Sequence, residues 1–124
     1  MIDVPGSIDD EYNIQTCFFV NQNNLNTYLS SNSRVASGGV DFFLSGNRRN
    51  IEKGAKVGVH SWSDGIIDGA CIPKEDKSHN MFLNFYKSIG IDTSFYWFTL
   101  RSASADSIHW MSYDEMNRFG LIKN

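Results

Sequence analysis

A chain of 124 residues with 41% hydrophobic and 20% charged residues has the composition of one ordinary globular domain, which excludes a disordered or low-complexity protein. Its formal net charge of −3 argues against a nucleic-acid partner, because a phosphate-binding surface needs clustered lysine and arginine. No run approaches the roughly 20 apolar residues that span a bilayer, so we expect no membrane insertion by this chain.

The first predicted elements are the end of a strand and a long helix. Residues 1–4 lead into a sharp turn at 5–7, and Ser7 is placed to cap the helix that follows. The helical face predicted to pack on the core carries Ile8, Tyr12, Gln15 and Phe19, widened by Ile14, Cys17 and Phe18. Cys17 and Cys71 are too few for a disulfide framework, and we expect reduced thiols.

Short strands and a buried helix are predicted in the middle of the chain. Residues 27–29 read as a strand and residues 30–34 as turns. The small residues 35–39 then lead into a helix that we expect to be buried over 40–44. Residues 56–60 form a strand by composition and by their boundaries. The basic residues near this strand are interpreted as a solvated turn face: Arg48, Arg49, Lys53 and Lys56.

The last third of the chain predicts a long loop and three helices. Residues 61–77, rich in Gly, Asp and Ser, form a loop of the kind that is usually functional or mobile in a compact domain. Residues 78–89 predict a helix whose core face carries Phe82, Phe85, Tyr86 and Ile89. Another helix is expected to start at Asp92, and Ser112 with Glu115 forms a capping box for the last one. Because strands and helices alternate throughout, we predict an α/β fold.

Ser37 and His60 form the strongest candidate for a catalytic pair. A serine hydroxyl is a poor nucleophile until a neighbouring base accepts its proton, and histidine is the usual base. Ser37 lies at a predicted loop-to-helix junction between small residues, where helix N–H groups can stabilise a developing oxyanion. His60 ends a predicted strand, where side chains often point into a cleft. The alternative interpretations are a helix cap for Ser37 and a polar strand end for His60.

The order of several short motifs adds a resemblance to a known family. They are Pro5-Gly6-Ser7-Ile8 before a helix, Ala36-Ser37-Gly38-Gly39 at the start of another, and a strand that ends in His60. In this order they resemble the Clp protease proteolytic subunit and its relatives. The closing run Trp110-Met111-Ser112-Tyr113-Asp114-Glu115, with Phe119-Gly120-Leu121 after it, resembles the family's last strand and helix. Lys56-Val57-Gly58-Val59-His60, with Ile91-Asp92, resembles the family's uncharacterised, predicted periplasmic branch.

The resemblance covers nearly the whole chain and implies a fold and a reaction. The fold would be the α/β spiral of ββα units that Clp proteases share with crotonases, as a single domain over residues 1–124 without the family's N-terminal strands. The reaction would be hydrolysis of a peptide or ester substrate by a serine peptidase, with no cofactor, in a homo-oligomer. The branch implies a periplasmic location, although we read no targeting signal in the sequence.

The residue roles of the family carry over by position. Ser37 would be the nucleophile and His60 the general base, with the backbone N–H groups of Gly6 and Gly38 as the oxyanion hole. Asp106 lies near the place of the family's aspartate, shifted along the chain, and is the candidate acid that orients His60. The alternative interpretation of Asp106 is a loop aspartate that caps a turn.

Three features depart from the family pattern and keep other functions open. Pro5 stands where the family usually has the first glycine of its turn. Asp41 occupies a usually apolar helix position, which predicts that the helix after Ser37 is less buried. The chain also starts inside what would be an internal strand, so we expect a fragment or an edge supplied by another chain. The alternatives are a non-catalytic assembly or binding subunit and a crotonase-like acyl-thioester enzyme.

Other side chains carry weaker signals. Neither His79 nor His109 has the spacing of a dedicated metal site, and loose chelation by His60 and Asp64 is the least favoured interpretation, so we predict no metal. Trp62, just beyond His60, is a candidate for the lining of a substrate groove or a lid on the core. The aromatic residues 95–98 are interpreted as core or as a subunit interface.

Overall fold

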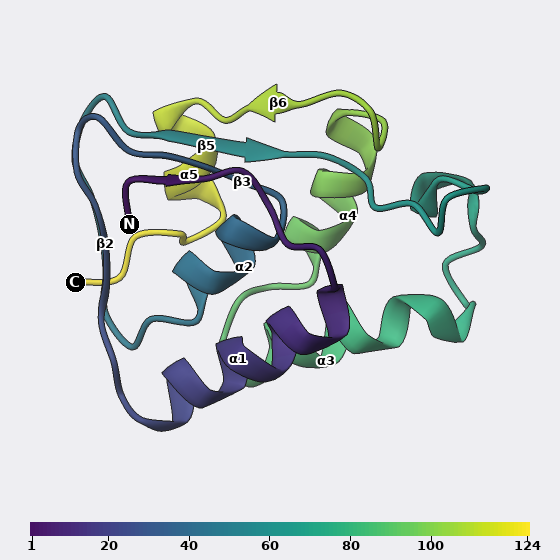
Figure 1. The fold of residues 1–124 in the computed structure, drawn as a ribbon, viewed down its shortest axis with the longest axis horizontal. Coiled ribbons are helices and arrows are strands. Elements are labelled where there is room, and N and C mark those ends of the chain that lie inside the picture. Colours follow the sequence, from purple (N-terminus) through teal and green to yellow (C-terminus); the bar gives the residue numbers. More distant parts are fainter.

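The computed structural model describes residues 1–124 and confirms a mixed α/β architecture. Its main sheet contains four strands in the order β1 (Asp3–Val4), β3 (Arg34–Ala36), β5 (Lys56–Val59) and β6 (His109–Trp110). The first three strands run parallel, and β6 runs antiparallel to β5. A second sheet pairs β2 (Thr27–Leu29) with β4 (Arg49–Ile51) in parallel, and β2 runs across the direction of β5 (Figure 1).

Five helices accompany the two sheets. They are α1 (Asp10–Gln22), α2 (Gly38–Leu44), α3 (Asn80–Ser88), α4 (Ser94–Ser102) and α5 (Tyr113–Arg118). Two short 3-10 turns, η1 (Gly69–Cys71) and η2 (Lys77–His79), lie in the segment between β5 and α3. Helix α2 packs against β3 and β5 on one side and against α1 on the other, while α3 contacts both α1 and α4 (Figure 1). The helices and the sheet thus enclose one core of 20 buried apolar residues.

The helix predicted over residues 78–89 is confirmed as α3. Its four predicted core side chains are all buried: Phe82, Phe85, Tyr86 and Ile89. Gly90 ends the helix with a φ of +77°, a left-handed conformation that favours glycine. The helical spacing of the apolar residues and the glycine that follows them are therefore sufficient to predict this helix.

The predicted core face of α1 is confirmed for Ile14 and Cys17 and wrong for Ile8, Tyr12, Gln15 and Phe19. Ile14, Cys17 and Val20 are buried, whereas Ile8, Tyr12 and Phe19 are exposed. Two asparagine amides fix the rotation of the helix, because Asn13 donates to the Gly38 carbonyl at 3.0 Å and Asn21 to the Ser45 carbonyl at 3.1 Å. These two bonds turn the asparagine face of α1 toward α2. A prediction based on large apolar side chains does not find this face.

The predicted cap of α1 is also wrong. The carboxylate of Asp9 accepts the N–H of Tyr12 at 3.1 Å and caps the helix. Ser7 instead donates its hydroxyl to Asp10 at 2.8 Å. Both residue types are good caps, so the sequence alone leaves the first turn uncertain by a few residues.

The basic segment predicted as a solvated turn face is only partly one. Arg48, Lys53 and Lys56 are exposed, but Arg49 is buried on strand β4. Its guanidinium donates to four backbone carbonyls, those of Leu44, Gly46, Gly120 and Leu121. Successive residues of a strand face opposite sides, so the pairing of β2 with β4 turns Arg49 inward while Arg48 stays outside.

The segment before the candidate serine is more regular than predicted. Residues 34–36 form the central strand β3, where turns and a small-residue passage were expected. Arg34, Val35 and Ala36 pair with β5 in register, and the first two also pair with β1. A segment of three residues is too short for its hydrophobic pattern to identify a strand. Strand β3 is stabilised instead by its pairing with β1 and β5.

Candidate active site

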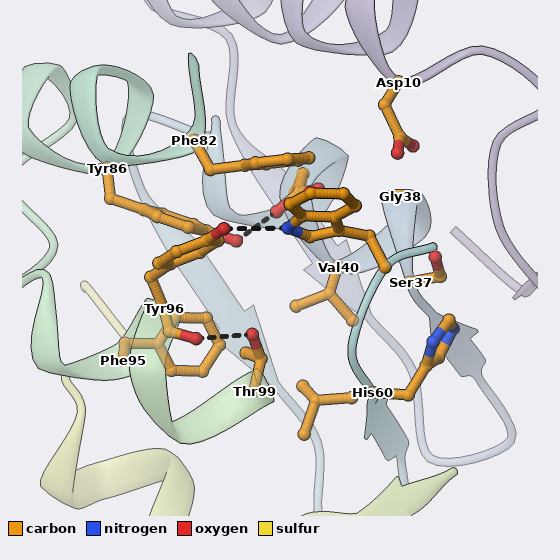
Figure 2. A pocket seen from close by; sticks show the side chains of 13 residues that line it. Asp10, Ser37, Gly38, Val40, His60, Phe82, Tyr86, Phe95, Tyr96 and Thr99 are labelled. Carbon is orange, nitrogen blue, oxygen red and sulfur yellow. Dashed lines mark hydrogen bonds between the residues drawn. The ribbon is translucent and has the colours of Figure 1, made fainter. Parts of the chain in front are cut away.

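The candidate catalytic groups follow the three parallel strands. Gly6 comes shortly after β1, Ser37 directly after β3 and His60 directly after β5. The carboxyl ends of parallel strands meet at one edge of a sheet, which is where α/β proteins usually bind ligands. Ser37 and His60 accordingly line the same cavity (Figure 2).

Ser37 has an unusual backbone conformation. Its φ of +53° and ψ of −126° lie in a region that residues other than glycine rarely adopt. The turn is held by a bond from the Ser37 N–H to the Gly58 carbonyl at 3.2 Å. A strained strand-to-helix turn of this kind exposes the nucleophile in α/β-hydrolases. Ser37 stands at the cap position of α2, yet its hydroxyl caps nothing, so the helix-cap interpretation is wrong.

Gly6 and Gly38 bring backbone N–H groups close to this serine. A β-carbon built at Gly6 would lie 3.4 Å from the Ser37 Cβ and 3.8 Å from its hydroxyl oxygen. A β-carbon at Gly38 would lie 2.4 Å from the Ser7 hydroxyl, so only glycine fits there. The Gly6 N–H donates to no acceptor, and Gly38 opens α2, where N–H groups have no intrahelical acceptor. Both N–H groups therefore have no acceptor within the protein.

His60 is held in one tautomer by a backbone carbonyl. Its Nδ1 lies 2.7 Å from the carbonyl oxygen of Ser61. A carbonyl can only accept, so Nδ1 carries the proton and Nε2 keeps its lone pair. No hydrogen bond joins this ring to Ser37, although both side chains lie on the same side of the cavity (Figure 2). The ring therefore has the protonation pattern of a general base, with Nε2 unoccupied.

The structure does not bring Asp106 to His60. The Asp106 carboxylate is exposed and accepts the hydroxyl of Ser104 at 2.6 Å, which matches its alternative interpretation as a turn aspartate. The carboxylate that interacts electrostatically with His60 is Asp68, which sequence reasoning missed. It belongs to the loop predicted over 61–77, and the expected functional character of that loop was the only signal that pointed toward it.

Asp68 is held in place by neighbouring donors. Its carboxylate accepts the N–H of Ala70 at 3.0 Å and the N–H of Ala105 at 2.8 Å. The Ser61 hydroxyl, these N–H groups and the nearby His60 together hold the pKa of Asp68 below its usual value. Asp68 is therefore a fixed carboxylate near His60.

The cavity behind Ser37 is small and has both apolar and polar lining residues. Its inner wall consists of Val40, Val59, Phe82, Tyr86, Phe95, Tyr96 and Thr99. Its volume is about 50 Å³. About 10–15 Å³ accommodates one water molecule, so the cavity has room for a side chain of a few atoms.

Trp62 lines this cavity and belongs to a hydrogen-bond chain beneath it. The indole N–H of Trp62 donates to the Tyr96 hydroxyl at 2.8 Å, and that hydroxyl lies 2.6 Å from Nδ1 of His79. His79 Nε2 faces the Ile72 carbonyl at 3.3 Å and must donate to it, so Tyr96 donates to Nδ1. Both nitrogens of the buried His79 are thereby engaged within the protein.

Asp41 lies on the wall of the cavity and is buried, with 8% of its surface exposed. The prediction that it makes α2 less buried is therefore wrong. The hydroxyl of Tyr86 donates to Asp41 Oδ1 at 2.5 Å. Burial raises the pKa of Asp41 to about 7, because a charged carboxylate is poorly solvated there.

The other aromatic and histidine residues singled out by the sequence have structural partners. Phe95 and Tyr96 are buried and Trp97 and Phe98 are half-buried, which places this aromatic helix in the core. His109 pairs with Glu115 at 2.7 Å. No three or more His, Cys, Asp or Glu side chains lie close enough together to hold a metal ion. None of the helices is both long and apolar enough to cross a membrane.

Comparison of this chain with protein-family models, with curated proteins and with solved structures found no match in any of the three.

Proposed function

We propose that this protein is a serine hydrolase that transfers the acyl group of a peptide or ester to Ser37. The observation that carries the proposal is the unpartnered Ser37 hydroxyl on a strained turn, in one cavity with a histidine whose Nε2 is unoccupied. Strained backbone concentrates at functional sites, where the surrounding structure has to maintain it. The free N–H groups of Gly6 and Gly38 beside the serine support the same chemistry.

The proposed reaction proceeds in two acyl-transfer steps. The Ser37 oxygen attacks the substrate carbonyl carbon while His60 Nε2 accepts the hydroxyl proton. The N–H groups of Gly6 and Gly38 bind the oxyanion, which exists only in the transition state and the tetrahedral intermediate. The leaving group takes the proton from His60 as the intermediate collapses. A water molecule then repeats the sequence on the acyl-enzyme and releases the acid.

The proposal is tested by covalent labelling with a fluorophosphonate, read out by intact mass. The wild-type protein is expected to gain one adduct, because the activated serine displaces fluoride from the probe. Ser37→Ala is expected to gain none, since the nucleophile is absent, and His60→Ala to react far more slowly, since the base is absent. Ser94→Ala, at an exposed serine outside the cavity, is the control and should label like the wild type.

A non-catalytic binding subunit is the second candidate function. It is favoured by the absence of a hydrogen bond between Ser37 and His60, although such bonds often tighten only when substrate is bound. A folded wild-type protein that gains no adduct would contradict the hydrolase and favour this candidate. Circular dichroism of the same sample establishes that the protein is folded.

Asp68 rather than Asp106 is expected to support His60 in this mechanism. Asp68→Asn should lower kcat about tenfold at an unchanged KM, because the carboxylate favours the imidazolium that forms during the reaction and does not contact substrate. Asp106→Asn removes the same charge from an exposed turn and serves as the matched control, with no expected change in kcat. An effect of Asp106→Asn as large as that of Asp68→Asn would contradict this assignment.

A further inference from the structure

The cavity contains one carboxylate oxygen without a partner. Asp41 follows Ser37 by four residues and lies on the first turn of α2, and both residues line the same cavity. Tyr86 satisfies Oδ1, but Oδ2 accepts no hydrogen bond from the protein. No fully enclosed side-chain nitrogen or oxygen in the chain lacks a partner, so Oδ2 must border open space. The space that Asp41 lines is the cavity behind Ser37.

The other polar groups of the inner wall are already engaged. The Tyr96 hydroxyl is bonded to Trp62 and His79, and the Thr99 hydroxyl donates to the Tyr96 carbonyl at 2.7 Å. The aliphatic and aromatic groups that complete this side of the cavity are those of Val40, Val59, Phe82 and Phe95. Burying a carboxylate in such surroundings is unfavourable unless a donor meets it. A neutral amide at position 41 could accept from Tyr86 equally well, so the bond to Tyr86 alone does not account for an acid here.

We propose that Asp41 selects substrates whose acyl-side residue carries a linear side chain ending in a primary amine, as in lysine or ornithine. This inference rests on the proposed hydrolase function. Asp41 lies three residues beyond Gly38, a rise of about 4.5 Å along α2, which is on the scale of a chain of three or four methylenes. The small cavity and its apolar wall fit the methylenes, and Oδ2 receives the ammonium group.

The preference for an amine should depend on the ionisation of Asp41. Burial raises the pKa of Asp41 to about 7, and the groups that face it are Tyr86 from α3, Tyr96 from α4, and Cys17 and Asp10 from α1. A lysine amine stays protonated well above this pH. The selectivity for the amine should therefore rise with pH as Asp41 ionises. Because selectivity is a ratio of two kcat/KM values, any ionisation common to both reactions, such as that of His60, cancels.

The experiment compares two substrates that differ only at the end of the side chain. These are the p-nitrophenyl esters of Nα-acetyl-lysine and Nα-acetyl-norleucine, assayed from pH 5.5 to 8.5. The wild type is expected to prefer the lysine ester above pH 7. Asp41→Asn should lower this preference by about ten- to a hundredfold, the range for losing a hydrogen bond to a charged group, and should abolish its pH dependence. The asparagine keeps an acceptor for Tyr86, so the variant should fold.

Asp10→Asn is the matched control, because Asp10 is the second carboxylate of the cavity and lies on α1 near Gly38 (Figure 2). Its lysine preference should stay within about threefold of the wild type, since its charge would act from a distance through water. Equal loss in both variants would overturn the inference, as would wild-type hydrolysis of the norleucine ester as fast as the lysine ester. Absence of both hydrolysis and fluorophosphonate labelling would instead overturn the proposed function, and this inference with it.

Discussion

A glycine in place of Ser37 is expected to lower hydrolysis by about 10⁴-fold or more and, at the same time, to stabilise the protein. The loss of activity follows from removal of the nucleophile. The gain in stability follows from the backbone, since glycine adopts a φ of +53° without the steric cost that serine has there. Strain of this kind amounts to about 1–3 kcal/mol, and the flexibility of glycine in the unfolded chain offsets about 0.5–1 kcal/mol. The free energy of unfolding should rise by about 1 kcal/mol, measured by urea denaturation.

Two further variants separate the contributions of the hydroxyl and the backbone. Ser37→Ala also removes the nucleophile but keeps a β-carbon, so it should be inactive without becoming more stable. Asn24 has a similar φ of +55° outside the cavity, in a conformation that asparagine tolerates well. Asn24→Gly should therefore leave activity unchanged and shift stability by less than about 0.5 kcal/mol. A Ser37→Gly protein no more stable than Ser37→Ala would show that the turn is not strained.

Replacing Arg49 by methionine is expected to reduce the free energy of unfolding by about 3 kcal/mol. The guanidinium donates to Leu121 at 2.8 Å, Gly120 at 3.0 Å, Leu44 at 3.2 Å and Gly46 at 3.3 Å. It thereby joins the end of α2 to the segment after α5, and methionine would leave all four carbonyls without this donor. The loss is a large share of the roughly 5–15 kcal/mol that stabilises a domain. Urea denaturation monitored by tryptophan fluorescence measures it.

The neighbouring Arg48 provides the control for this prediction. Arg48→Met removes the same charge from an exposed position and should change stability by less than about 0.5 kcal/mol. Arg49→Lys should lie between wild type and Arg49→Met, because a lysine ammonium cannot match the fork of a guanidinium across two chain segments. Equal stability of the two methionine variants would contradict the bridging role of Arg49.

The sequence predicted the elements that have strong local signals and missed those that depend on partners. The periodicity of α3 and the glycine after it were sufficient, as was the capping serine of α5, where Ser112 accepts the N–H of Glu115 at 3.1 Å. The capping box itself is incomplete, because the Glu115 carboxylate bonds to His109. Strand β3, the rotation of α1 and the burial of Arg49 all depend on contacts between segments far apart in the sequence. No local pattern encodes such contacts.

In the candidate site, too, the residue types could be predicted from the sequence, whereas the contacts between distant segments could not. The resemblance and the residue types identified Ser37 and His60 as candidate site residues. The structure places both in one cavity with Gly38. Asp106 and Asp68 could not be distinguished from sequence, since both are loop aspartates and only the path of the loop after β5 decides which one reaches His60. The burial of Asp41 depends on its partner Tyr86, 45 residues away. The spiral fold of Clp proteases, the homo-oligomer and the periplasmic location implied by the resemblance stay predictions.

The parallel pairing of β1, β3 and β5 has a consequence for how the protein folds. Parallel strands cannot form as a hairpin, and the paired residues Asp3 and Arg34 are 31 positions apart in the sequence. Closing such long loops costs chain entropy before any contact compensates for it, so these pairings should form slowly. Gly6, Ser37 and His60 come together only once all three strands are in register. If the proposed hydrolase function holds, the rate of reaction with a fluorophosphonate would report the last stage of refolding, since chains with unpaired strands contain every residue of the proposed site but not the assembled site.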